Sequence, residues 1–135
     1  MKKKFSLLLV SFLLVSCDYL NTYSIVNNSG EDLIVEASYY DSYIDHNNVK
    51  KSLMFNLASK EILLLDTINY KVKIKLKHNE EFSLGFKTNG YPNLEHNKKI
   101  LIYKKDSLVF YGNQYIIQNL YSNTRQNHKE VLNIY

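Results

Sequence analysis

The chain of 135 residues is poor in residues that cross-link or break a backbone, with one cysteine, one proline, four glycines and no tryptophan. One cysteine excludes a disulfide within the chain, and the length excludes a barrel or doubly wound enzyme fold. Alanine is also scarce at two residues, whereas Val, Ile, Thr, Tyr and Phe together number 41. Because β-branched and aromatic side chains suit a pleated sheet, the composition predicts one all-β domain.

Residues 1–16 have the pattern of a cleaved export signal. Lys2, Lys3 and Lys4 form a basic start, and Phe5–Val15 is an apolar stretch of eleven residues broken by two serines. This stretch is shorter than the ~20 residues that span a bilayer. Ordinary signal cleavage requires small residues at positions −3 and −1 from the cut. A cut before Cys17 would place the bulky Leu14 at −3, which favours a different peptidase.

The segment from Leu14 to Cys17, LVSC, resembles the lipobox of bacterial lipoproteins. The resemblance implies removal of residues 1–16 and a diacylglycerol on the thiol of Cys17, with residues 17–21 as a short lipidated tether. Each buried CH₂ contributes about 0.8 kcal/mol, so two or three acyl chains such as palmitate would hold the protein in a bilayer. The expected location is the cell envelope, on the outer membrane and facing the periplasm, because only Asp18 represents the acidic run that directs such proteins to the surface.

Loss of the leader leaves a nearly neutral protein. The full chain has a net charge of +4, but the mature chain would have 14 basic and 13 acidic residues and a charge of +1. Nucleic-acid-binding domains are usually strongly basic, so no nucleic-acid partner is expected. The lipid bilayer, and an envelope protein or glycan, are the expected partners.

Short strands separated by turn formers follow along residues 22–135. The stretch from Tyr70 to His78 is the clearest, because Tyr70, Val72, Ile74 and Leu76 alternate with lysines. We expect hairpins between 22–26 and 33–40, between 70–78 and 82–86, and between 100–103 and 108–111. Leu53 to Leu57 should form a strand, 62–65 a strand buried on both faces, 115–120 a strand or a helical turn, and 131–135 a closing strand.

Eight to ten short strands predict a single antiparallel β-sandwich-like domain of the immunoglobulin or transthyretin type over residues 22–135. The stretches 23–29 and 32–35 are similar to the first hairpin of small β-sandwich lipoproteins of Bacteroidota-type bacteria. In that group, Asp-Ser/Thr-aliphatic triplets are glycosylated, which implies O-glycosylation of Thr67 and Ser107.

No pattern of catalytic residues is present. The sequence lacks G-x-S-x-G, a P-loop, G-x-G-x-x-G and H-E-x-x-H, and its four histidines are isolated. We therefore expect no cofactor, metal or catalytic residue, and a non-enzymatic binding or structural module. The alternative is an envelope hydrolase or a carbohydrate-active accessory protein with an unrecognised carboxylate pair.

Two groups of side chains are candidate contact surfaces. One group is Lys71, Lys73, Lys75 and Lys77, which project from one face of their strand. We expect all four to be exposed, and they could contact an anionic component. The alternatives are a solvated face or protection of a free sheet edge. Tyr39, Tyr40 and Tyr43 are the densest tyrosine group, suited to an interface or a carbohydrate, although tyrosine also fills tryptophan-free cores.

Overall fold

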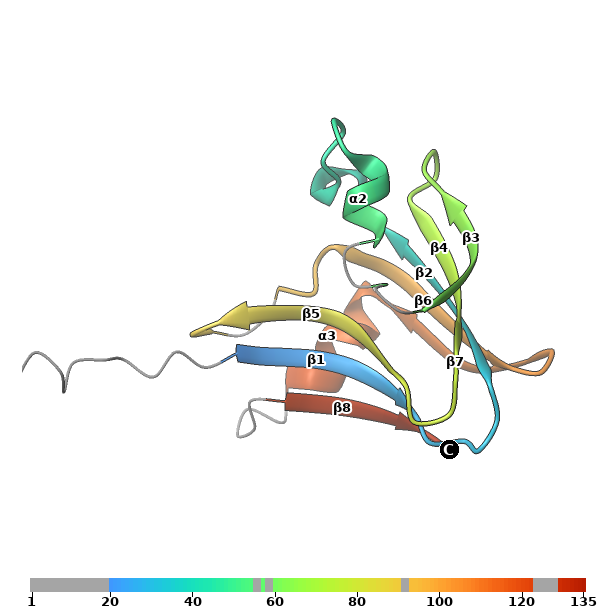
Figure 1. Ribbon diagram of the computed structural model, residues 1–135. Helices are drawn as coiled ribbons and strands as arrows, with labels where there is room; N and C mark the ends of the chain where they lie inside the picture. The colour runs from blue at the N-terminus through green and yellow to red at the C-terminus, as the bar shows by residue number, and fades with distance from the viewer. Residues whose placement is uncertain (1–19, 55–56, 58–59, 91–92, 123–128) are drawn as a thin grey trace, which may run out of the picture.

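The computed structural model describes residues 20–54, 57, 60–90, 93–122 and 129–135, and most of these residues lie in two β-sheets (Figure 1). The first sheet has the strand order β5-β1-β8, formed by β1 (Leu20–Asn27), β5 (Glu81–Thr88) and β8 (Lys129–Ile134). The second has the order β3-β4-β2-β6-β7, formed by β2 (Leu33–Tyr39), β3 (Glu61–Asp66), β4 (Lys71–Leu76), β6 (Asn97–Lys104) and β7 (Ser107–Asn113). The predicted all-β class is confirmed. Pairing is antiparallel as expected except between β1 and β8, which run parallel.

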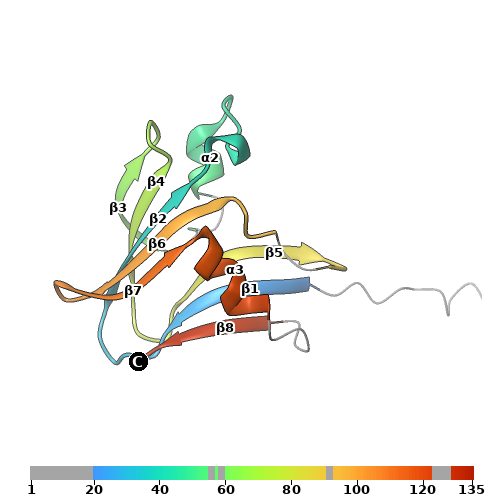
Figure 2. The ribbon, with the colours of Figure 1, turned by 180° about the vertical axis from the view of Figure 1, so that it is seen from behind.

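Three short helical segments join the strands: η1 (Asp41–Tyr43), α2 (Val49–Met54) and α3 (Gln114–Ser122). Figure 2 shows α3 between the three-stranded sheet and β7. The ring of Tyr121 on α3 stacks on that of Tyr23 at 4.7 Å between centroids, and its hydroxyl donates to the Ser24 carbonyl at 2.9 Å. The helix that connects β7 to β8 therefore packs against both sheets, where only a strand or a single helical turn was expected.

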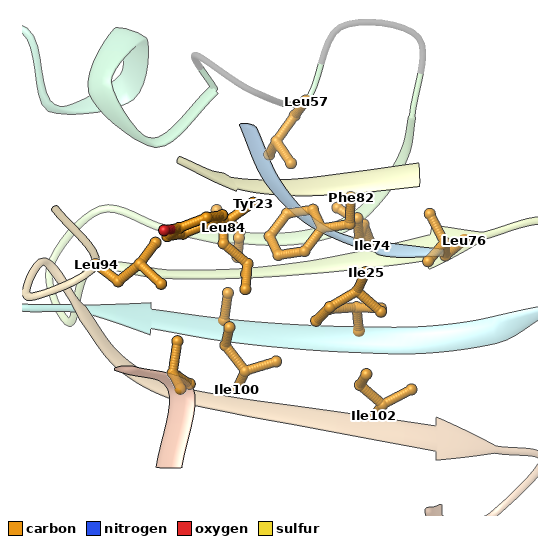
Figure 3. Packing of buried hydrophobic residues seen from close by; sticks show 14 of the residues in the cluster. Tyr23, Ile25, Leu57, Ile74, Leu76, Phe82, Leu84, Leu94, Ile100 and Ile102 are labelled. Carbon is orange, nitrogen blue, oxygen red and sulfur yellow. The ribbon is translucent and has the colours of Figure 1, made fainter. Parts of the chain in front are cut away.

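The core lies between the two sheets (Figure 3). Phe82 and Ile25 come from the three-stranded sheet, whereas Ile74 and Ile102 come from the five-stranded sheet, and all four are at most 1 % exposed. At Gly112, an added Cβ would lie 2.9 Å from Phe110 and about as close to Ile117, so this strand end has no room for a side chain. Burial of these apolar side chains is the main force that holds the two sheets together.

The strand with the clearest alternation has the burial pattern that the sequence predicts. Val72, Ile74 and Leu76 on β4 are fully buried, as the register predicts. The hairpin of β6 and β7 is confirmed, with Lys105 at φ 55° in its turn, and so is the closing strand β8.

Two other expected hairpins are wrong, because their strands belong to different sheets. β1 pairs with β5 and β8 while β2 pairs with β4 and β6, and β4 does not pair with β5. The connections cross the sandwich as arches and bond to each other, since the Gly30 N–H donates to the His78 Nδ1 at 3.2 Å. The second arch also bonds to the end of β1, where the Asn79 N–H donates to the Asn27 carbonyl. Gly30 at φ 75° and Asn79 at φ 63° supply the positive φ angles of these turns.

Two expected strands also need correction. Leu53 lies on α2 and is 3 % exposed, so the expected strand from Leu53 to Leu57 begins in a helix; the Phe55 position lies outside the described residues. The run at 62–65 forms β3, but β3 is an edge strand with Leu63 and Leu64 nearly half exposed rather than buried on both faces. A continuous apolar run cannot distinguish a central strand from an edge strand with apolar residues on both faces.

Candidate functional site

The lysines of β4 lie on the outer face of the five-stranded sheet. Lys71, Lys73 and Lys75 are half-buried and Lys77 is exposed, although all four were expected to be exposed. The Lys75 Nζ is 3.0 Å from a carboxylate oxygen of Asp32, and this contact raises the pKa of Lys75. Glu36 is the cross-strand partner of Lys73, and Asp66 is that of Lys71.

β4 lies between β3 and β2, so the interpretation of these lysines as protection of a free edge is wrong. Their half-exposed position agrees with the interpretation as a solvated face. The contact surface for an anionic component stays a prediction. Carboxylates such as Asp32 and Glu36 lie beside the lysines of this surface.

The predicted modification sites lie in different parts of the chain. Thr67 is exposed in the turn between β3 and β4, where the Asp66 carboxylate accepts the backbone N–H of Ile68 and Asn69. Ser107 is exposed at the first position of β7. Both hydroxyls are accessible to a glycosyltransferase, and both stay predicted sites. Cys17 lies outside the described residues.

Two members of the tyrosine group, Tyr39 and Tyr43, line a pocket of about 440 Å³, a volume typical of small-molecule sites. Its lining residues come from the C-terminal end of β2, from η1, α2 and the segment between them, and from the residue before β6. Figure 1 shows the end of β2 beside α2. The lining of the pocket combines aromatic rings with hydrogen-bonding groups: Tyr39, Tyr43, Ile44, Asp45, Asn48, Lys51, Ser52, Leu53 and His96. We refer to it as the tyrosine–histidine pocket.

His96 is the centre of the aromatic wall. Its ring is stacked on Tyr39, with centroids 6.2 Å apart and planes 11° from parallel, and the tilted ring of Tyr43 is 5.9 Å away. The Nε2 atom lies 2.9 Å from the Leu84 carbonyl oxygen, a hydrogen bond that requires the proton on Nε2, and 3.2 Å from the Asn97 Nδ2. Burial lowers the pKa of His96, so the imidazole is neutral at physiological pH. Burial also raises the pKa of Tyr39, which therefore keeps its hydroxyl proton.

Tyr43 is held over the pocket by a carboxylate. Its hydroxyl donates to the Glu95 Oε2 at 3.1 Å, and the Asn93 side-chain amide donates to the same oxygen at 3.0 Å. These two bonds, chiefly that from Asn93, lower the pKa of Glu95, while the bond to Glu95 raises the pKa of Tyr43. Glu95 is thus a charged acceptor and Tyr43 a neutral donor, and the Tyr43 ring is 47 % exposed.

The polar side of the pocket is one compact turn. The Asp45 N–H donates to the Ser52 hydroxyl at 3.3 Å, and the Asn48 N–H donates to the Asp45 carbonyl at 2.8 Å. The buried side chains of Ile44 and Leu53 anchor this turn to the core. Lys51 makes no ion pair with a described residue, so its ammonium group is available to a ligand.

A second small cluster braces the same segment from outside. The His46 Nε2 lies 3.4 Å from an oxygen of Asp41, and the Tyr70 hydroxyl bonds to Asp41, which raises the pKa of Tyr70. The rings of His46 and Tyr70 meet edge to face at 6.3 Å. The turn before β4 therefore holds η1 in place beside the tyrosine–histidine pocket.

The sequence indicated Tyr39, Tyr40 and Tyr43 but missed His96 and Glu95, which are more than 50 residues away along the chain. Tyr40 lies outside the lining, with the Lys98 Nζ 5.9 Å from its ring centroid. The only nearby signal was the adjacent pair Glu95-His96. Among the described residues, no group of three His, Cys, Asp or Glu side chains could hold a metal ion.

Within the described part of the chain, every helix is too short or too polar to cross a bilayer. Comparison with known proteins gives no match: no family model, no curated protein and no solved structure matches the chain.

Proposed function

We propose that this chain is a lipid-anchored binding module of the bacterial cell envelope and that its tyrosine–histidine pocket binds a glycan. The observation that carries the proposal is the lining of the pocket, which combines the half-exposed Tyr43 with the polar residues Asp45, Asn48 and Lys51. A sugar ring has an apolar face and a rim of hydroxyls, so it matches an aromatic ring beside several hydrogen-bonding groups.

The pocket is suited to binding because its polar groups are held before a ligand arrives. Tyr43 is fixed by Glu95, His96 by the Leu84 carbonyl, and Ser52 by the turn at Asp45. Groups that are already ordered lose little conformational entropy when they bind a ligand. The bonds from Asn93 and Tyr43 lower the pKa of Glu95, so this carboxylate is suited to accept hydrogen bonds and poorly suited to act as a general acid.

The anchoring part of the proposal rests on the leader. We propose that residues 1–16 are removed, that Cys17 carries the lipid, and that residues 17–21 tether a sandwich of the immunoglobulin or transthyretin type. β1 includes Leu20, three residues after Cys17, so residues 20–21 of the proposed tether are already part of the first strand. A domain on so short a tether would meet ligands at the surface of its own membrane.

The anchor is tested by the intact mass of protein extracted from membranes. We expect loss of residues 1–16 and the added mass of a diacyl or triacyl cysteine. A Cys17→Ala protein should leave the membrane fraction. If that variant stays in the membrane as firmly as the wild type, the lipidation is wrong.

The pocket is tested with soluble peptidoglycan fragments and lipopolysaccharide core oligosaccharides, titrated against the purified protein. Tyr43→Ala should weaken the binding of a retained fragment about tenfold, because a stacked ring contributes about 1.4 kcal/mol. Tyr115→Ala is the matched control, because Tyr115 is 72 % exposed on α3 and does not line the pocket. Equal affinities of the two variants would refute the site.

The same incubations distinguish the enzymatic alternative. A hydrolase would add one water across a glycosidic bond, and mass spectrometry would detect shortened fragments. Unchanged fragments that bind with an affinity sensitive to Tyr43→Ala are the result expected of a binding module.

A further inference from the structure

One end of the three-stranded sheet carries an apolar surface that the strand pattern would have buried. Phe82, Leu84 and Phe86 alternate on β5, and regular pairing would turn all three toward the core. Instead, Tyr23 of β1 pairs with Gly85 while Ser24 pairs with Ser83, so Leu84 is the extra residue of a β-bulge. A bulge reverses the alternation beyond it, and Phe86 is consequently 45 % exposed.

A second apolar side chain lies on the same face. Phe86 pairs with Thr22, and Leu20 is two residues before Thr22 on β1, so Leu20 and Phe86 project on one side of the sheet. Leu20 is 53 % exposed, which leaves both apolar side chains of this face partly open to the surroundings. Figure 1 shows the start of β1 and the end of β5 side by side at one end of the molecule.

The chain itself determines what can cover this surface. Cys17 is three residues before Leu20, and three extended residues span at most about 11 Å. A lipid on Cys17 would hold Leu20 within this distance of the headgroup region. Aromatic and apolar side chains on one exposed face are the kind that enter a membrane interface, where they lie at the boundary between the headgroups and the acyl chains.

We infer that the face carrying Leu20 and Phe86 is a membrane-contact surface that rests in the interface of the bilayer holding the anchor. This inference rests on the proposed function, since it needs the lipid on Cys17. The contact orients the domain, with the end of β5 toward the bilayer and the hairpin of β6 and β7 away from it (Figures 1 and 2).

The absence of tryptophan from the chain provides a direct test. Phe86→Trp and Leu20→Trp each place a single tryptophan on the proposed surface, and Leu108→Trp places one on the opposite hairpin at a matched exposure of 52 %. Each full-length lipidated variant is reconstituted into phosphatidylethanolamine–phosphatidylglycerol vesicles, with or without bromine near the headgroup end of the acyl chains. Brominated lipid should quench most of the emission at positions 86 and 20, with a blue shift, and leave position 108 unchanged.

The outcomes separate the two proposals. If the protein floats with the vesicles and the tryptophans at 86 and 20 are no more quenched than the one at 108, the membrane-contact surface is refuted and the anchor stands. If the wild-type protein carries no acyl mass and does not float, the anchor fails and the inference fails with it. Two probe positions on one face keep the test valid if one variant does not fold, which circular dichroism would reveal.

Discussion

Asn27 is the residue whose removal should most directly weaken the connection between the sheets. Its side chain is fully buried at the end of β1, beside the two arches that cross the sandwich. The Nδ2 atom donates to the carbonyls of Leu76 at 2.8 Å and Glu31 at 2.7 Å, and the Oδ1 atom accepts two bonds from Ser29. Asn27→Ala removes all four bonds and leaves the backbone bonds of Asn27 in place.

The cost follows from where each partner lies. The bond to Leu76 is buried, and a buried acceptor that loses its donor costs about 1–3 kcal/mol. Water can reach the partly buried Glu31 and Ser29 groups, so each of those bonds contributes only about 0.5 kcal/mol. The total is about 3 kcal/mol, which lowers a urea midpoint by about 2 M for an m-value of about 1.5 kcal/mol/M.

The matched control is Asn28→Ala, the same substitution at the next residue. The Asn28 side chain bonds to Asn133 on the exposed surface, so its loss should change stability by less than about 0.5 kcal/mol. Urea unfolding followed by circular dichroism measures both variants. Coincident midpoints would refute the argument that the buried bonds of Asn27 hold the arches together.

Three further predictions concern pH, packing and charge. Burial lowers the folded-state pKa of His96, so its contribution to stability is present above the unfolded pKa of about 6.5 and is lost as the pH falls below it. The midpoint of thermal unfolding should therefore fall with pH in this range, and it should fall less steeply for His96→Gln. Gly112→Ala should destabilise the protein by about 1–3 kcal/mol in urea, because the added methyl group has no space; a stability equal to that of the wild type would contradict the packing. Replacing Lys73 and Lys75 together by Gln should not cause self-association detectable by light scattering, because β4 is not an edge strand. If these lysines contact an anionic component, the same variant should bind anionic vesicles more weakly and with less dependence on salt.

Local periodicity predicted the elements that depend on neighbouring residues. The alternation around Ile74 fixed both the position and the register of β4, and the turn at Lys105 joined β6 to β7 as expected. The predictions of these elements are confirmed because the side-chain pattern and the turn both lie within about ten residues of chain. In each case the burial of one face selects one register.

Strand partners could not be predicted in the same way. The turn formers near Gly30 and Asn79 are typical of hairpins, but an arch between two sheets uses the same residues and the same positive φ angles. The difference depends on pairing with β8 and β6, which lie far along the chain. The pocket could not be predicted for the same reason. Tyr43 belongs to a tyrosine group that the sequence indicates, but Glu95 and His96 come into contact with it only in the fold.

The bulge at Leu84 connects the two proposed surfaces. Leu84 has no partner residue on β1, and its carbonyl accepts bonds at the start of β6, from the His96 ring and from the side chain of Asn97, the first residue of that strand. The same extra residue turns Phe86 to the outside, toward the proposed bilayer contact. One irregularity in β5 therefore fixes the aromatic wall of the pocket and orients the apolar end of the sheet. A glycan in the pocket would consequently be held at a set angle to the membrane, which favours ligands that are themselves attached to that membrane or lie against it.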